Sequence, residues 1–235
     1  MNNKLIIIPA YNEEKRIRKV IKEIRRVDKK VDLVVVDDGS EDETYERARI
    51  KGVVVLRHCN NLGYGAALQT GFKYALKNEY DYVMQMDADG QHRAVYIREF
   101  FSKIEEGRWD VIVGSRFINK AGYKIPFMRK IGMGVFSWLA SVITGKRITD
   151  PTSGFRVINR KVIKFYASNI YPTDFPDADV IIMLNFSGAR IKEIPVMMRR
   201  STKKTSMHNG IKPVYYIFKV FFSIFLTLFR ERKKI

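Results

Sequence analysis

Carboxylate side chains follow several apolar runs of the chain, at points where short strands would end. Asp87 and Asp89 come directly after the run at residues 82–86, and side chains two apart share a face of an extended chain. Hard oxygen ligands of this kind suit Mg²⁺ or Mn²⁺ bridging a diphosphate. The second Asp-x-Asp, Asp177 and Asp179, does not follow a buried strand, so the first pair is the predicted metal site. The alternative is a pair that only caps the backbone amides of a turn.

Asp37 and Asp38 follow an earlier apolar run and allow the same two interpretations. The stretch Asp-Asp-Gly-Ser is a good turn sequence, and Asp commonly caps a following helix. A ligand role is favoured by the expected neighbours Glu13 and Asp87. A dense carboxylate cluster is costly unless a metal or hydrogen-bond donors compensate its charge.

These carboxylates need a scaffold, and the first half of the chain alternates apolar runs with helical patterns. Strands are predicted at 5–8, 33–36, 53–56, 82–86 and 111–113, with helices at 13–27, 44–50, 66–76 and 95–104. Short Val/Ile runs between helices indicate an α/β fold with a mostly parallel open sheet, flanked by helices, that binds ligands at the carboxyl ends of its strands. Gly63 and Gly65 precede the third helix without the full dinucleotide fingerprint, which argues against a nicotinamide cofactor.

Composition bounds the class of protein and the chemistry of its partners. The 46% hydrophobic content excludes a disordered or fibrous chain, and the net charge of +18 favours anionic partners. Nucleic acid is one alternative, supported by Arg199-Arg200 and Lys203-Lys204, but it leaves the carboxylates unexplained. The single Cys59 and the early break at Pro9 favour a cytoplasmic protein without a signal peptide.

Several motifs together resemble the inverting family 2 glycosyltransferases, and among them the dolichyl-phosphate mannose synthase-like branch. This resemblance implies a GT-A fold, which binds a nucleotide sugar. The motifs run from residue 9 to about residue 200: Pro9-Ala10-Tyr11-Asn12-Glu13-Glu14, Val36-Asp37-Asp38-Gly39-Ser40, Asn61-Leu62-Gly63-Tyr64-Gly65-Ala66, Asp87-Ala88-Asp89-Gly90-Gln91-His92, Gly114-Ser115-Arg116 and Asp150-Pro151-Thr152-Ser153-Gly154-Phe155-Arg156.

The resemblance assigns roles to individual residues. A divalent metal, Mg²⁺ or Mn²⁺, is expected on Asp87, Asp89 and Gln91, where it neutralises the leaving diphosphate. Arg116 and Arg129 are expected to bind an acceptor phosphate. Arg93-Ala94 stand where the family usually has Pro, which puts the contacts of that turn in doubt. The residues expected to hold the nucleotide sugar are Pro9, Ala10, Tyr11, Glu13, Asp37, Asp38, Gly63, Asp87, Ala88 and Asp89.

The expected reaction moves a hexose from a nucleoside diphosphate sugar, GDP-mannose or a UDP-hexose, to a lipid-linked acceptor. Polyprenyl phosphate is the first choice, because an anionic phosphate needs no base. The alternative acceptor is a sugar hydroxyl of a surface glycan or glycolipid, which would require a carboxylate base, and Asp177 and Asp179 are the candidates.

Two amphipathic segments follow in the second half. Residues 128–144 and 212–230 carry polar or basic stripes opposite broad apolar arcs, which suits a bilayer interface or packing on the domain or a second protomer. We expect a domain at 1–210, with a donor half at 1–116 and an acceptor half at 117–210, and a basic membrane-interface tail at 211–235. The predicted location is therefore peripheral, on the inner face of the cell membrane.

Overall fold

The computed structural model describes residues 3–118, 127–169, 171, 172, 176, 178–199 and 222, with the backbone alone at 127–132. The predicted tail at 211–235 lies outside this part of the chain except for Phe222, and Asp177 lies outside it too. The strands are β1 (Lys4–Ala10), β2 (Asp32–Asp37), β3 (Val53–Arg57), β4 (Tyr82–Gln85), β5 (Val111–Ser115), β6 (Arg156–Asn159) and β7 (Ile191–Pro195). The helices are α1 (Ile17–Val27), α2 (Thr44–Ala48), α3 (Tyr64–Lys77), the 3₁₀ turn η1 (Ala94–Tyr96), α4 (Ile97–Glu105), α5 (Phe127–Thr144), α6 (Arg160–Tyr166) and α7 (Ala178–Phe186).

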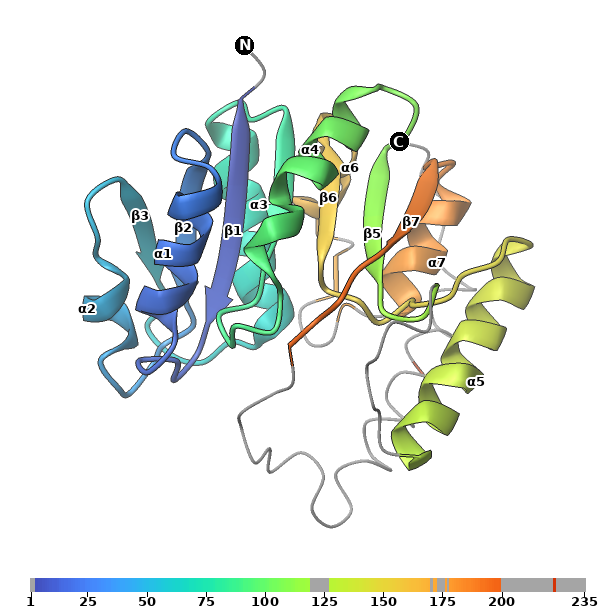
Figure 1. Cartoon of the computed structure of the whole chain (residues 1–235), viewed down its shortest axis with the longest axis horizontal. Helices are drawn as coiled ribbons and strands as arrows, with labels where there is room; N and C mark the ends of the chain where they lie inside the picture. The colour runs from blue at the N-terminus through green and yellow to red at the C-terminus, as the bar shows by residue number, and fades with distance from the viewer. Residues whose placement is uncertain are drawn as a thin grey trace.

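These strands form one seven-stranded sheet in the order β3-β2-β1-β4-β6-β5-β7. Its neighbours run parallel except at β6, which is antiparallel to both β4 and β5. The carboxyl ends of β1, β2 and β4 therefore lie at one edge of the sheet, at the bottom of Figure 1. We call this edge the rim.

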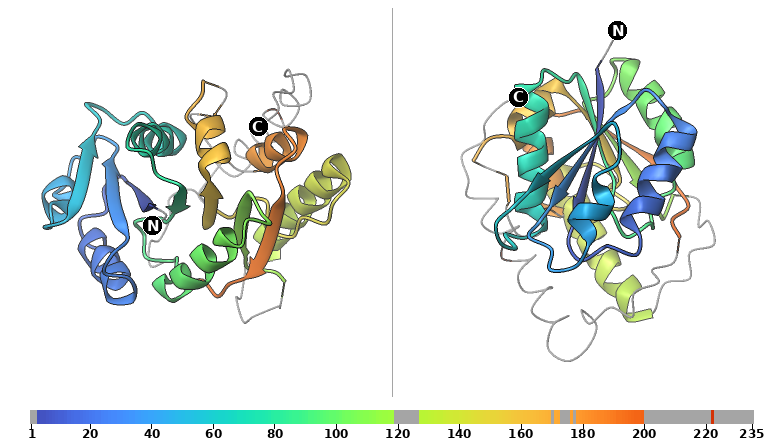
Figure 2. Two further views of the ribbon diagram at one scale, coloured as in Figure 1. Left: turned by 90° about the horizontal axis from the view of Figure 1, so that it is seen from above. Right: turned by 90° about the vertical axis from the view of Figure 1, so that its left-hand side faces the viewer.

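Helices cover both faces of the sheet, which produces two apolar cores. Alternate residues of β1 divide between them: Leu5 and Ile7 belong to one core, and Ile6 and Ile8 to the other. The first core lies under α3, α6 and α7, and the second under α1 and α4, on opposite sides of the sheet (Figure 2). Because both faces of the sheet are buried, most of its strands consist of consecutive apolar residues, chiefly Val and Ile.

The sequence predicts the first five strands but not the last two. All five predicted strands and the four helices between them are present, although α1 begins at Ile17 rather than near residue 13. The intervening residues form a turn, in which the backbone N–H groups of Arg16 and Ile17 both donate to the carbonyl oxygen of Glu13. Strands β6 and β7 are additions that the alternation does not predict.

Candidate active site at the rim

Backbone hydrogen bonds tie together the loops that leave β1, β2 and β4. The N–H of Asp38 donates to the carbonyl of Ala10 at 2.9 Å, and the N–H of Met86 donates to that of Ile7 at 3.0 Å. The N–H of Asn12, whose φ is 53°, donates to the Ser40 hydroxyl at 3.0 Å. The predicted nucleotide residues of the first two loops are therefore neighbours.

Asp37, the last residue of β2, is fully buried at this edge. Its Oδ1 accepts a hydrogen bond from the N–H of Ser40 at 3.2 Å. Arg57 Nε lies 3.1 Å from Oδ2 and forms an ion pair without hydrogen-bond geometry, so Oδ2 accepts no hydrogen bond in the structure. A buried carboxylate oxygen in this state suits a donor group from a ligand.

Asp38 is engaged by the protein itself. Its Oδ1 lies 2.7 Å from Nδ1 of His58 and accepts the N–H of Leu62 at 2.9 Å, while Oδ2 accepts the N–H of Gly63 at 2.9 Å. The second ring nitrogen of His58 contacts the Thr70 hydroxyl at 2.8 Å. Asp38 thus holds the loop that leads into α3, and Gly63 sits there with a φ of 101°, which favours glycine.

The remaining residues predicted to bind the nucleotide sugar differ in exposure. Tyr11 is 40% exposed, while Glu13 is only 7% exposed and its carboxylate contacts Arg16 Nε at 2.6 Å. Pro9, Ala10 and Ala88 are buried, so they can offer a ligand mainly their backbone and the shape of the loop.

Asp87 stands directly beyond β4, and its side chain is 29% exposed. Tyr64 donates its hydroxyl proton to Oδ1 at 2.7 Å, and the side-chain amide of Gln85 donates to the Tyr64 oxygen at 3.1 Å. Burial, with the nearby charge of Asp87, raises the pKa of Tyr64 well above its usual value, so the hydroxyl stays protonated. On the other side, His92 Nε2 lies 3.5 Å from Oδ2.

Asp89 and Gln91, further along the same loop, are hydrogen-bonded to each other. Oδ1 of Asp89 accepts the N–H of Gln91 at 2.9 Å, and its Oδ2 accepts the side-chain amide of Gln91. That donation leaves the amide oxygen of Gln91 for another partner. Among the described residues no group of three or more His, Cys, Asp or Glu is placed to hold a metal ion. Two carboxylates and an amide oxygen fit Mg²⁺ or Mn²⁺, since Mg²⁺ is usually bound by one or two carboxylates together with substrate phosphates.

The predicted acceptor residue Arg116 forms a two-pronged ion pair. Its Nε and Nη2 donate to Oδ2 and Oδ1 of Asp150, both at 2.7 Å, and its backbone N–H donates to Oδ2 at 3.0 Å. Asp150 is fully buried, and its own N–H donates to Glu193 at 2.8 Å. Burial raises the pKa of Glu193, against the hydrogen bonds that it accepts from Thr149 and Asp150. Arg129 lies in the first part of α5, at 127–132, where the structure describes the backbone alone.

The base candidate Asp179 lies in the apolar helix α7 and is 1% exposed. Burial raises the pKa of Tyr166 to about 12, and the charge of Asp179 adds to this effect while that of Arg156 opposes it. The structure therefore places Asp179 inside the protein beside a tyrosine. Its role as a base stays a prediction, as does that of Asp177.

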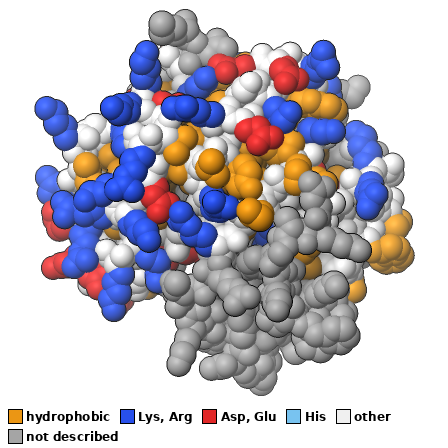
Figure 3. All heavy atoms as spheres, viewed as in Figure 1, with side chains coloured by type: hydrophobic (Ala, Val, Ile, Leu, Met, Phe, Trp, Pro, Cys, Tyr) orange, Lys and Arg blue, Asp and Glu red, His pale blue; other side chains and the backbone are white. Residues whose placement is uncertain are grey.

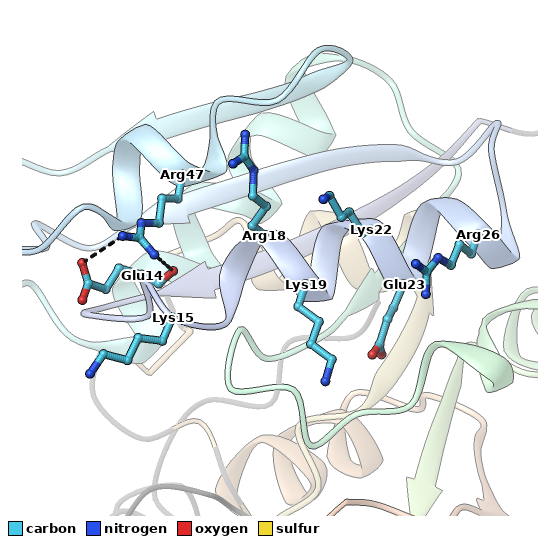
Figure 4. Close-up of a pocket in the computed structure, with 8 residues that line it drawn as sticks. All are labelled: Glu14, Lys15, Arg18, Lys19, Lys22, Glu23, Arg26 and Arg47. Carbon is cyan, nitrogen blue, oxygen red and sulfur yellow. Dashed lines mark hydrogen bonds and ion pairs between the residues drawn. The ribbon is translucent and has the colours of Figure 1, made fainter.

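A basic groove of about 470 Å³ runs along α1 and begins at Glu14, in the loop after β1 (Figure 4). Lys and Arg side chains gather on this side of the molecule (Figure 3). Arg47 in this groove pairs with Glu43 at 2.6 Å, and Glu23 pairs with Arg199 at 2.7 Å. The other cations of the groove make no ion pair within the described ranges. The groove is suited to anions rather than to a metal ion. Its lining is Glu14, Lys15, Arg18, Lys19, Lys22, Glu23, Arg26 and Arg47.

Helix α5 turns two hydroxyls of its polar stripe toward the protein. The hydroxyls of Ser137 and Ser141 donate to the carbonyl of Ile148 at 2.5 and 3.2 Å. Of the apolar arc predicted for this helix, Phe136 is buried, while Trp138 and Val142 are 64% and 61% exposed. Part of the arc therefore packs on the domain and part faces outward. Within the described ranges, none of the helices is long and apolar enough to cross a bilayer.

Comparison with known proteins identifies the family and the fold. The model of glycosyl transferase family 2 matches residues 5–166. The chain belongs to this family. It is 29% identical to the UDP-N-acetylglucosamine–dolichyl-phosphate N-acetylglucosaminyltransferase of Methanococcus voltae, over 96% of this chain and 97% of the relative. It is 30% identical to the dolichyl-phosphate hexose transferase of Haloferax volcanii, over 86% of this chain and 85% of the relative.

Among solved structures, glucosyl-3-phosphoglycerate synthase from Mycobacterium tuberculosis, in complex with Mn²⁺ and UDP-glucose, superposes with a TM-score of 0.73. The match covers 96% of this chain and 78% of that protein at 17% sequence identity, which bears on the fold alone. The predicted GT-A fold and the predicted family are both confirmed.

Sequence reasoning did not find the side chains that hold the carboxylates. Tyr64 holds Asp87 and is itself held by Gln85, His58 holds Asp38, and Glu193 holds the segment that carries Asp150. Each of these contacts joins segments that are far apart in the sequence. Tyr64 lies inside a motif of the resemblance, but nothing in the motif says which residue it contacts.

Proposed function

We propose that this family 2 glycosyltransferase moves a hexose from a nucleoside diphosphate sugar to polyprenyl phosphate. The observation that carries the proposal is the position of Asp37, Asp38 and Asp87 at the carboxyl ends of β2 and β4, the two strands that flank β1, in a chain of this family. Ligands bind at this edge of open α/β sheets. The relatives named above act on dolichyl phosphate, by their names.

The donor would lie across the loops after β1, β2 and β4. Pro9, Ala10, Tyr11 and Glu13 line the first loop, and the buried Asp37 oxygen without a hydrogen bond suits an N–H of the donor. Asp38 and Gly63 fix the shape of the wall beside it, and Ala88 lies between the two metal-binding carboxylates. Both GDP-mannose and a UDP-hexose remain candidates, and the solved structure with UDP-glucose supports the second.

Asp87, Asp89 and Gln91 would hold Mg²⁺ or Mn²⁺. The metal, when bound, supplies positive charge to the diphosphate that leaves the sugar. The partly exposed Asp87 and the amide oxygen of Gln91 can face it, and Asp89 also keeps Gln91 in place. The Mn²⁺ in the solved structure supports a divalent ion, without choosing between the two metals.

Polyprenyl phosphate is favoured over a sugar hydroxyl as acceptor. A phosphate is already anionic and needs no base, whereas a hydroxyl would need a carboxylate within hydrogen-bond reach. The one described base candidate, Asp179, is buried at 1% exposure. Arg116 and Arg129 are the proposed phosphate contacts, and the pairing with Asp150 would hold the Arg116 guanidinium in a fixed orientation.

The membrane surface is the proposed location, because the acceptor is a lipid. The outward Trp138 and Val142 of α5 suit the interface of a bilayer, where tryptophan is common. The cations along α1 would add attraction to anionic lipids. Attachment at the inner face of the cell membrane agrees with the unpaired Cys59.

A transfer assay with purified protein tests this proposal. The protein is incubated with Mg²⁺ or Mn²⁺, polyprenyl phosphate in detergent, and radiolabelled GDP-mannose, UDP-glucose or UDP-N-acetylglucosamine in turn. Label in the lipid fraction from one donor supports the proposal and names the sugar. Metal-dependent donor hydrolysis without a labelled lipid would instead favour the glycan hydroxyl as acceptor.

A further inference from the structure

The carboxylate of Asp87 is held from two sides by residues without an assigned role. Tyr64, the first residue of α3, donates to Oδ1 at 2.7 Å. His92 accepts the backbone N–H of Asp87 at Nδ1, at 3.0 Å, so the proton of the neutral ring lies on Nε2. That nitrogen faces Oδ2 at 3.5 Å. Both oxygens of Asp87 therefore have a neighbour that favours one orientation of the carboxylate.

The Tyr64 hydroxyl is itself fixed. The amide of Gln85, a residue that is 4% exposed, donates to the Tyr64 oxygen at 3.1 Å. Since a hydroxyl has one proton, this leaves it for Asp87. The order of donation runs from Gln85 through Tyr64 to Asp87, and it ends on the carboxylate proposed to face the metal.

The segment between α5 and β6 supports both sides of this arrangement. A Cβ atom at Gly154 would lie 3.0 Å from the Tyr64 hydroxyl oxygen and 3.7 Å from Oδ1 of Asp87. The next residue, Phe155, stacks on the His92 ring with centroids 4.6 Å apart and planes 14° apart. Gly154 leaves room for Tyr64, and Phe155 sets the plane of His92.

We propose that Tyr64 is a positioning residue, which fixes the carboxylate of Asp87 so that its free lone pairs face the divalent cation. The inference rests on the proposed function, because it requires a metal at Asp87. Groups that orient metal ligands change metal affinity by about 10- to 100-fold when they are removed. The ring of Tyr64 also packs against the core, so only its hydroxyl is at issue.

The test is the binding of Mn²⁺ to Tyr64→Phe, measured from the electron paramagnetic resonance signal of the free ion, with UDP or GDP present. We expect an affinity about tenfold lower than that of the unsubstituted protein. In the transfer assay, the Mn²⁺ concentration for half-activation should rise, with kcat near normal at saturating Mn²⁺. A loss of structure alone would not produce this split.

Tyr80→Phe is the matched control. It removes another tyrosine-to-aspartate hydrogen bond, from Tyr80 to Asp32 at 3.0 Å, on the exposed surface. It should leave Mn²⁺ affinity unchanged. Gly154→Ala is a second, independent variant, which crowds the Tyr64 hydroxyl with a methyl group and should also weaken Mn²⁺ binding.

Two results would overturn the inference, and only the second of them also contradicts the proposed metal site. If Tyr64→Phe and Gly154→Ala bind Mn²⁺ as tightly as the unsubstituted protein, Tyr64 does not position Asp87, and the proposed function stands. If the unsubstituted protein binds no Mn²⁺ with either nucleotide, the metal site fails, and the inference fails with it.

Discussion

Replacing Asp150 by Asn should destabilise the protein strongly, because it breaks a buried ion pair and keeps the side-chain volume. Asp150 is fully buried, and the side chain of Arg116 is only 10% exposed. The substitution removes the charge that accepts three hydrogen bonds from Arg116. Breaking a buried pair by removing one partner costs about 3–5 kcal/mol. We expect the lower end, about 3 kcal/mol, because Asn can still accept one of these bonds.

The assay is urea unfolding at pH 7. With a slope near 2 kcal/mol per molar, a loss of about 3 kcal/mol lowers the midpoint by roughly 1.5 M without changing the slope. The double variant Arg116→Met with Asp150→Leu is the control, since replacing both members by apolar groups is often close to neutral. A loss below about 1 kcal/mol in Asp150→Asn, or a double variant as unstable as the sum of its two single substitutions, would refute this account of the pair.

Three further changes test other parts of the structure. Asp110→Asn should lower the free energy of unfolding by about 1 kcal/mol at pH 7. Burial alone would raise the pKa of Asp110, but the hydrogen bonds and the charge of Arg190 bring it below its usual value. The effect is small because the Arg190 side chain is half exposed. The charged Asp110 stabilises the protein at pH values above its pKa in the unfolded chain, and this stabilisation is lost as the pH falls through its pKa in the folded protein. In urea unfolding, the difference between Asp110→Asn and the unsubstituted protein should therefore vanish in acid, and a difference independent of pH would contradict this account. Gly71→Ala should lower the free energy of unfolding by about 1–2 kcal/mol despite better helix propensity, because the new Cβ would lie 2.5 Å from an isoleucine of β1; stabilisation contradicts that packing. Trp138→Ser should reduce co-sedimentation with anionic vesicles without altering urea unfolding, whereas Val54→Ser, exposed on β3, should not; equal binding by both contradicts the α5 surface.

The sequence predicts the parts of this protein that depend on local pattern. Apolar runs mark β1, β2 and β4, and parallel topology then brings Asp37 and Asp87 to one edge. The antiparallel β6 was not predicted, because its residue Arg156 is charged yet 2% exposed, with backbone carbonyls of Ser153 and Pro151 as acceptors.

The partners of the site residues could not be predicted for a related reason. Helical periodicity places Tyr64 at the start of a helix but cannot show that its hydroxyl meets Asp87 across the rim. Likewise, the amphipathic pattern of residues 128–144 cannot show that the hydroxyls of Ser137 and Ser141 donate to the carbonyl of Ile148. Such contacts depend on how separate elements pack.

The most direct test of the central claim is the mass of the lipid after incubation with the donor that the transfer assay selects. We predict that polyprenyl phosphate gains the mass of one sugar residue in the presence of Mg²⁺ or Mn²⁺, and that a chelator or Asp89→Asn abolishes the gain. Asp81→Asn, which changes the carboxylate before β4 rather than one after it, should keep the activity. A sugar-bearing lipid formed without a divalent metal, or formed equally well by Asp89→Asn, would contradict the proposed mechanism.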